Sequence, residues 1–145
     1  MKISLLESNV WVALAMDRHA DHQEALAWFN GAPDDGSSCF SRMTQNSFLR
    51  LVSSKGIFQE DAMTNQQAVA AYRQFRLDPR VGWIDEPAGL ENRWFSAASV
   101  KLPAPKRWMD PYLFAYARLS GARLITFDNG FEQYHSQGLE LVLLG

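Results

Sequence analysis

Short apolar segments alternate with amphipathic helical patterns along this chain, and that alternation restricts its fold more than any other feature. The apolar runs that suit strands are residues 2–6, 38–41, 81–84, 123–127 and 140–144. Between them, apolar residues recur at helical spacing in segments 10–16, 21–30, 44–52, 64–75, 90–100 and 110–121. Parallel strands need crossover connections, which are usually helices. The sequence therefore predicts a three-layer α/β/α sandwich around a mostly parallel central sheet.

Polar residues stand where several of these helices are expected to begin. Asp21 and Thr64 precede apolar helical stretches and are predicted N-caps. Asp110 is followed by Pro111, so we expect Asp110 at the N-cap and Pro111 at the first helical position. Since 145 residues is a common size for one domain, we predict a single domain over residues 1–145.

Composition narrows the class of protein. Apolar residues make up 47% of the chain, enough for a core, but no apolar run approaches the roughly 20 residues that a membrane span needs. Glu7 interrupts the first apolar run too early for a secretory signal. The lone Cys39 cannot form an internal disulfide and excludes a cysteine-built zinc site. We therefore expect a cytoplasmic protein that does not enter a membrane.

The net charge of −2 argues against a protein that coats nucleic acid through bulk positive charge. The charges are nevertheless segregated along the chain. Residues 36–59 contain Arg42, Arg50 and Lys55 but no acid, and residues 92–109 contain four basic residues and no acid. We therefore expect local basic surface despite the acidic total.

Three isolated carboxylates form the candidate site. Glu7 and Asp128 each follow an apolar strand, and Asp110 begins the helix that leads into the strand before Asp128. In parallel sheets, functional groups gather beyond the carboxyl ends of the strands, so we expect all three at one sheet edge. Carboxylates that converge repel one another unless a cation lies between them. Mg²⁺ or Mn²⁺ is the cation that such oxygen ligands favour.

Each of these residues also has a purely structural interpretation. Asp110 can serve only as a helix cap, and Asp128, in Asp-Asn-Gly, only as a turn former. Glu7 fits a structural role less well, because glutamate is a poor turn former and is costly to bury at a strand end. Asn9, Gln45 and Thr126 have structural roles by default: a cap, a helix-surface amide and a strand hydroxyl.

Four segments, in order along the chain, carry a resemblance to a known family. They are Leu5-Leu6-Glu7-Ser8-Asn9-Val10-Trp11, Ser41-Arg42-Met43-Thr44-Gln45 leading to Phe48-Leu49-Arg50-Leu51, Trp108-Met109-Asp110-Pro111-Tyr112-Leu113, and Leu124-Ile125-Thr126-Phe127-Asp128-Asn129-Gly130-Phe131. Together they resemble the PIN-domain ribonucleases, in particular the VapC toxins of type II toxin-antitoxin systems. The resemblance implies a Mg²⁺- or Mn²⁺-dependent endoribonuclease that cuts tRNA, rRNA or mRNA, is neutralised by a cognate antitoxin and forms a homodimer.

The resemblance also implies roles for individual residues. Glu7, Asp110 and Asp128 would be the catalytic metal ligands, supported by a shell of Asn9, Gln45 and Thr126. Independently of the resemblance, the acid-free stretches place basic residues beside the expected site, and we expect these to grip RNA phosphates: Arg42, Lys106 and Arg107.

Two positions depart from the family pattern. The family has aspartate where this chain has Glu7. Most relatives have glutamate where it has Gln45, although glutamine also occurs there in the VapC branch. A carboxylate displaced by about 1 Å can cost on the order of 100-fold in rate. The departures leave a second hypothesis open, in which the domain has weakened or lost turnover and acts by binding antitoxin or RNA.

Other chemistries find little support. His19 and His22 are spaced i, i+3 in an acidic segment, but this segment lies away from the predicted strand ends. The chain lacks the glycine-rich signatures of P-loop, dinucleotide-binding and α/β-hydrolase sites.

Overall fold

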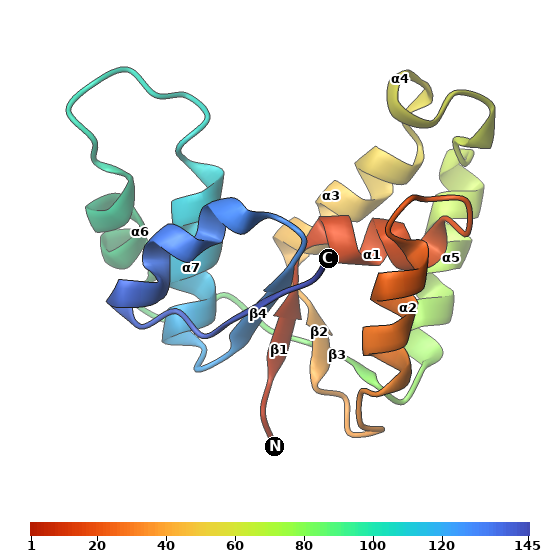
Figure 1. Cartoon of the computed structure of the whole chain (residues 1–145), viewed down its shortest axis with the longest axis horizontal. Coiled ribbons are helices and arrows are strands. Elements are labelled where there is room, and N and C mark those ends of the chain that lie inside the picture. Colours follow the sequence, from red (N-terminus) through yellow and green to blue (C-terminus); the bar gives the residue numbers. More distant parts are fainter.

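The computed structural model describes residues 1–145 and has the predicted three-layer α/β/α architecture (Figure 1). One sheet contains five strands in the order β3-β2-β1-β4-β5, and every neighbouring pair is parallel. The strands are β1 (Ser4–Leu6), β2 (Ser38–Phe40), β3 (Val81–Trp83), β4 (Arg123–Thr126) and β5 (Leu141–Leu143). The prediction of a mostly parallel central sheet is therefore confirmed.

Helices cover both faces of the sheet, in two groups that Figure 1 shows on opposite sides. The first group connects β1 to β2 and β2 to β3, and consists of α1 (Ser8–Ala15), α2 (His22–Asn30), α3 (Arg42–Val52), α4 (Lys55–Phe58), the short 3₁₀ helix η1 (Gln59–Asp61) and α5 (Asn65–Leu77). The second group follows β3 and consists of α6 (Leu90–Ala98), α7 (Met109–Leu119) and the 3₁₀ helix η2 (Asn129–Gln137). The structure contains no helix with the length and apolar character needed to cross a membrane.

Side-chain alternation along the central strands divides the core into two clusters. Leu6 and Ile125 belong to the cluster under the first group of helices, and Leu5 and Leu124 belong to the cluster under the second group. Successive side chains of a strand point to opposite faces, so β1 and β4 are buried on both sides. The two buried faces explain why these strands read as continuous apolar runs.

The helix starts test the predicted caps. Thr64 caps α5 as predicted: its side chain accepts a hydrogen bond from the Gln67 backbone N–H. Asp21 occupies the N-cap position of α2, but its side chain makes no cap hydrogen bond. The third helix was expected to begin at Thr44, but it begins at Arg42, because Ser41 and Thr44 form a reciprocal capping box.

The predicted N-cap role of Asp110 is wrong. Helix α7 begins at Met109 with Trp108 at its N-cap, so Asp110 and Pro111 lie within the first turn. Proline is tolerated there because the first backbone N–H groups of a helix have no partner within the helix. Asp110 is therefore not the capping residue, and its carboxylate lies close to those of Glu7 and Asp128.

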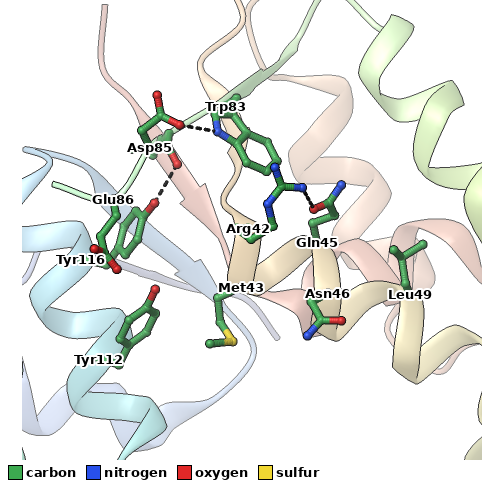
Figure 2. A pocket seen from close by; sticks show the side chains of 11 residues that line it. Arg42, Met43, Gln45, Asn46, Leu49, Trp83, Asp85, Glu86, Tyr112 and Tyr116 are labelled. Carbon is green, nitrogen blue, oxygen red and sulfur yellow. Dashed lines mark hydrogen bonds between the residues drawn. The ribbon is translucent and has the colours of Figure 1, made fainter.

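The strand order places a topological switch point at the centre of the sheet. From β1 the chain moves outward through β2 to β3, and then returns to the other side of β1 to form β4 and β5. Ligand sites in such sheets lie at the carboxyl ends of the strands around this point. A cavity of about 620 Å³ opens at the same edge, between α3, the end of β3 and α7 (Figure 2).

Candidate metal centre

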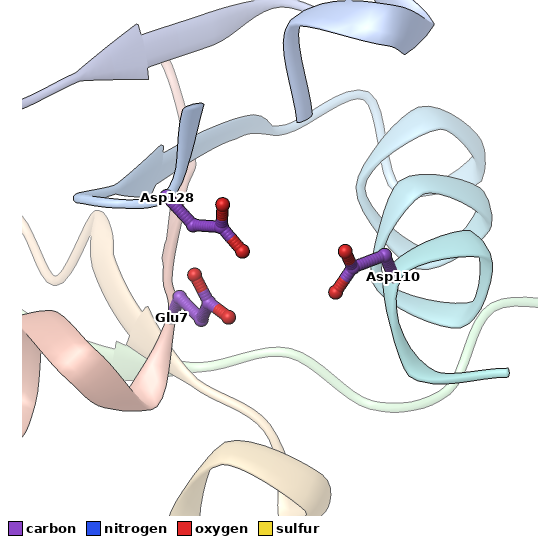
Figure 3. A group of neighbouring side chains, drawn as sticks. All are labelled: Glu7, Asp110 and Asp128. Carbon is purple, nitrogen blue, oxygen red and sulfur yellow. The ribbon is translucent and has the colours of Figure 1, made fainter. Parts of the chain in front are cut away.

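Three acidic side chains from separate parts of the chain meet at the carboxyl edge of the sheet. Glu7, Asp110 and Asp128 each offer a carboxylate oxygen within 4.8 Å of the others. Figure 3 shows Glu7 and Asp128 side by side at the ends of β1 and β4, with Asp110 facing them from α7. The spacing allows one cation to contact all three residues.

Parallel pairing of β1 and β4 places the first two acids together. Leu6 pairs with Ile125, so Glu7 and Asp128 both follow the paired ends of adjacent strands. Glu7 has extended backbone at the N-cap position of α1, and its side chain makes no cap hydrogen bond. Asp128 is also a turn former, as the structural interpretation predicted, because its Oδ1 accepts a hydrogen bond of 2.8 Å from Gly130 N–H. The second oxygen of Asp128 does not take part in that turn.

Thr126 and Asn9 hold the Glu7 carboxylate in place. The Thr126 hydroxyl donates a hydrogen bond to Glu7 Oε2, and Asn9 Nδ2 donates to the same oxygen at 3.0 Å. Asn9 Nδ2 also lies 3.3 Å from Thr126 Oγ1, which accepts a 2.9 Å hydrogen bond from the Asp128 backbone N–H. The side chains of Asn9 and Thr126 thus lie where the supporting shell is expected. They link Glu7 to β4, the strand that precedes Asp128.

The electrostatics of the cluster disfavour three negative charges without a cation. Burial raises the pKa of Glu7 from 4.5 to about 7, and the nearby carboxylates of Asp128 and Asp110 add to the rise, against the hydrogen bonds from Thr126 and Asn9. Burial, and then the charge of Asp128, also raises the pKa of Asp110. A divalent cation would reverse these effects by stabilising the ionised forms. An all-carboxylate donor set therefore fits Mg²⁺ or Mn²⁺.

Gln45 makes its side-chain hydrogen bond away from the acids. Its Oε1 accepts a hydrogen bond of 2.6 Å from Arg42 Nη1, and its side chain lines the neighbouring cavity (Figure 2). The predicted supporting role would require Gln45 to be linked to Glu7, and the structure does not show this link.

The basic residues expected to grip RNA lie on two sides of the cluster. Arg42 is exposed in the first turn of α3 and lies over the Trp83 ring, 4.9 Å from the ring centroid. Lys106 and Arg107 are exposed between α6 and α7, immediately before Asp110. Arg107 Nη2 donates a 3.4 Å hydrogen bond to Gln133 Oε1.

The histidines take part in local backbone contacts. His22 Nδ1 lies 2.8 Å from the Ala13 carbonyl oxygen, and His19 Nδ1 accepts a 3.0 Å hydrogen bond from the Asp21 backbone N–H. The group of potential metal ligands contains neither histidine.

The sequence interpretation missed the aromatic lining of the cavity beside the cluster. Trp83 ends β3, and Tyr112 and Tyr116 come from α7, two and six residues after Asp110. The available signal was the polar pair Asp85-Glu86 directly after a strand, which occupies the same edge of the sheet as Glu7 and Asp128.

The chain is similar over most of its length to proteins named as ribonucleases. Over 144 residues the chain is 41% identical to "Ribonuclease VapC41" of Mycobacterium tuberculosis, covering 97% of each protein. It is 30% identical over 132 residues to "Ribonuclease VapC44" of the same species, covering 86% of this chain and 85% of the relative.

Solved structures share the fold. The crystal structure of Mycobacterium tuberculosis VapC20 has a TM-score of 0.64 at 20% identity and covers 94% of this chain and 95% of its own. VapBC2 from Rickettsia felis, solved on a promoter DNA fragment, has a TM-score of 0.62 at 17% identity, with 99% of each chain covered. The family model of the PIN domain matches residues 4–136. With that match over most of its length, and with VapC ribonucleases as its relatives, the chain belongs to the PIN domain family.

Proposed function

We propose that this chain is a Mg²⁺- or Mn²⁺-dependent endoribonuclease and the toxin of a toxin-antitoxin pair. The observation that carries the proposal is the meeting of Glu7, Asp110 and Asp128 within 4.8 Å at the switch point of the sheet. A relative that is 41% identical over nearly the whole chain bears the name ribonuclease, which supports the same chemistry here.

The chain's own residues perform distinct tasks in this scheme. Bound at the cluster, a divalent cation supplies Lewis acidity and neutralises charge that develops on the phosphate. Glu7 must ionise to bind it, and the hydrogen bonds from Thr126 and Asn9 favour that ionised form. Asp128 is oriented by its hydrogen bond to Gly130, and Asp110 closes the cluster from α7.

The substrate in this proposal is cellular RNA of the tRNA, rRNA or mRNA class. Lys106 and Arg107 are exposed shortly before Asp110 and would contact phosphates, because cationic side chains position a nucleic acid backbone. Arg42, exposed at the start of α3, would also contact the RNA. This local basic surface offsets the repulsion that the net charge of −2 would otherwise exert on RNA.

The proposed partners are a cognate antitoxin and a second copy of this chain, in the cytoplasm. Structural neighbours include VapBC complexes from Rickettsia felis and Haemophilus influenzae, which supports an antitoxin here. Several large apolar side chains around α6 and the start of α7 are exposed, and these support a protein contact: Phe95, Leu102, Trp108 and Met109.

Two observations favour the alternative of a weakened or inactive domain. The pKa of Glu7 is raised to about 7, so without a cation this group is protonated in much of the protein at neutral pH. Gln45 is neutral and turned toward Arg42, so it adds no anionic ligand. Both features lower the affinity of the site for a cation.

A cleavage assay separates the two functions. Purified protein is incubated with tRNA and with rRNA in Mn²⁺ or in EDTA, beside Glu7→Asp and Asp110→Asn. We expect cleavage in Mn²⁺ that EDTA and Asp110→Asn abolish. Absence of cleavage by both the natural chain and Glu7→Asp, with RNA or antitoxin still bound, would establish the binding function instead.

A further inference from the structure

The cavity beside the carboxylate cluster has the size and lining of a ligand site. Its volume of about 620 Å³ falls in the range that small-molecule sites occupy, roughly 300 to 1,000 Å³. It opens at the ends of β2 and β3, next to the strand ends that carry Glu7 and Asp128. Its lining shares α7 with the cluster, since Tyr112 lies two residues after Asp110.

One wall of the cavity is a fixed planar cation. The Arg42 guanidinium lies over the Trp83 ring at 4.9 Å and donates a 2.6 Å hydrogen bond to Gln45 Oε1. Trp83 is itself fixed, because its Nε1 donates a 2.9 Å hydrogen bond to Asp85 Oδ1. A guanidinium held in this way presents a flat face, and proteins use such faces to stack RNA bases. Gln45 therefore has a role that the carboxylate cluster does not explain.

Tyrosines form the opposite wall. Figure 2 shows Arg42 and Gln45 on one side of the hollow and Tyr112 and Tyr116 on the other. The Tyr116 hydroxyl donates a 2.7 Å hydrogen bond to the Ile84 carbonyl oxygen, which fixes that ring. Tyr112 is half-buried, and Met43 lies between the two walls. Planar side chains on both sides of the cavity suit a flat aromatic ligand.

The charges at the rim select an uncharged ligand over a phosphate. Asp85 and Glu86 are exposed and line the cavity, so an anion entering it would be repelled. Carboxylates accept hydrogen bonds from the exocyclic amino groups of nucleobases. Asp85 Oδ1 already accepts a hydrogen bond from Trp83 Nε1, so we take Glu86 as the main acceptor.

We propose that this cavity binds one unstacked nucleobase of the RNA strand, with its face on Arg42 and an amino group toward Glu86. The inference rests on the proposed ribonuclease function, which supplies the RNA. It assigns Arg42 to base stacking, held in position by Trp83 and Gln45. Adenine, guanine and cytosine carry exocyclic amino groups and uracil does not, so the site should favour the first three over uracil.

Nucleotide binding tests the proposal without turnover. In EDTA, AMP, GMP, CMP, UMP or ribose 5-phosphate is titrated into ¹⁵N-labelled protein, and the Trp83 indole N–H signal, assigned with Trp83→Phe, is followed by NMR. We expect the nucleotides to shift this signal and ribose 5-phosphate to leave it unchanged. UMP should bind more weakly than the other three nucleotides, and Glu86→Leu, which has no acceptor, should remove that difference.

Matched arginine variants separate stacking from charge. Arg42→Lys keeps the charge but loses the planar group and should weaken nucleotide binding about tenfold. Arg50 is also exposed on α3 but does not line this cavity, so Arg50→Lys should leave binding unchanged. Three outcomes would overturn the base site. Ribose 5-phosphate shifts the Trp83 signal as much as the nucleotides do, the nucleotides cause no shift, or Arg42→Lys binds nucleotides as tightly as the natural chain. If the chain binds nucleotides but cleaves no RNA, the base site stands and the ribonuclease proposal fails. If it cleaves RNA but binds no nucleotide, the ribonuclease proposal stands and the base site fails.

Discussion

The Thr126 hydroxyl donates a hydrogen bond to the carboxylate of Glu7, joining residues that are 119 positions apart in the chain. Thr126 ends β4 and Glu7 follows β1, so the contact joins the two central strands at the point where the chain reverses its direction of travel across the sheet. Thr126 Oγ1 also accepts the Asp128 backbone N–H at 2.9 Å. One buried hydroxyl thus positions two of the three acids.

Removing that hydroxyl should weaken cation binding. Thr126→Val conserves the shape of the buried side chain but deletes the donor to Glu7, so the ionised carboxylate loses a stabilising partner. Loss of such an orienting contact typically costs 10- to 100-fold in metal affinity, about the effect we expect for Mn²⁺ measured by calorimetry. Thr126→Ser retains the hydroxyl and should bind nearly as the natural chain does. Equal affinity for all three proteins would contradict the role of Thr126.

Neutralising Asp110 should have opposite effects on the free and the metal-bound protein. Asp110→Asn removes a charge that faces Asp128, so the melting temperature in EDTA should rise slightly. For the natural chain, Mn²⁺ at 100 times its Kd should add about 2.7 kcal/mol to the free energy of unfolding. The variant should lose most of that gain, as measured by calorimetric melting.

Asp34→Asn provides the control for this experiment. Asp34 is exposed and lies outside the carboxylate cluster. Its variant should keep the full response to Mn²⁺. A natural chain whose melting curve does not respond to millimolar Mn²⁺ would argue against the metal centre.

The stability of the metal-free protein should fall as the pH rises from about 4.5 to about 7. The pKa of Glu7 is about 7 in the folded chain and 4.5 for the ordinary group, so the folded state holds a proton in this range that the unfolded state has lost. For one such proton, the free energy of unfolding falls by about 1.4 kcal/mol with each unit by which the pH rises. Glu7→Gln cannot titrate, so its stability should lack this part of the slope. Parallel urea-unfolding curves for the two proteins in EDTA across this pH range provide the measurement, and identical slopes would refute the assignment.

Gly82 in β3 should not accept a side chain. A Cβ atom at this position would lie 2.0 Å from the Gly36 carbonyl oxygen, which belongs to the backbone and cannot rotate away. Gly82→Ala should therefore cost about 1 to 3 kcal/mol of stability and displace β3, which carries Trp83. Gly56→Ala is the control, because its nearest contact would be an ordinary 3.7 Å to Ser54 Oγ. Denaturant unfolding of both variants tests the difference.

Local patterns in the sequence predicted the layers, the parallel sheet and the identity of the three acids. Apolar runs and helical spacing are local properties, and they determine which segments must be buried and in what form. Glu7 and Asp128 could be assigned to one edge because the carboxyl ends of parallel strands share it. Segments without strong periodicity, such as α4 and η2, were not predicted, because packing rather than local propensity maintains them.

Only the tertiary structure decided how the side chains at that edge are arranged. Gln45 is turned toward Arg42, which in turn lies over Trp83 from another part of the chain. The start of α7 at Met109 frees Asp110 from capping and turns it toward Glu7. The strand order brings Thr126 onto Glu7. Contacts between residues far apart in the chain arise from the packing of whole elements, and short-range sequence patterns do not encode that packing.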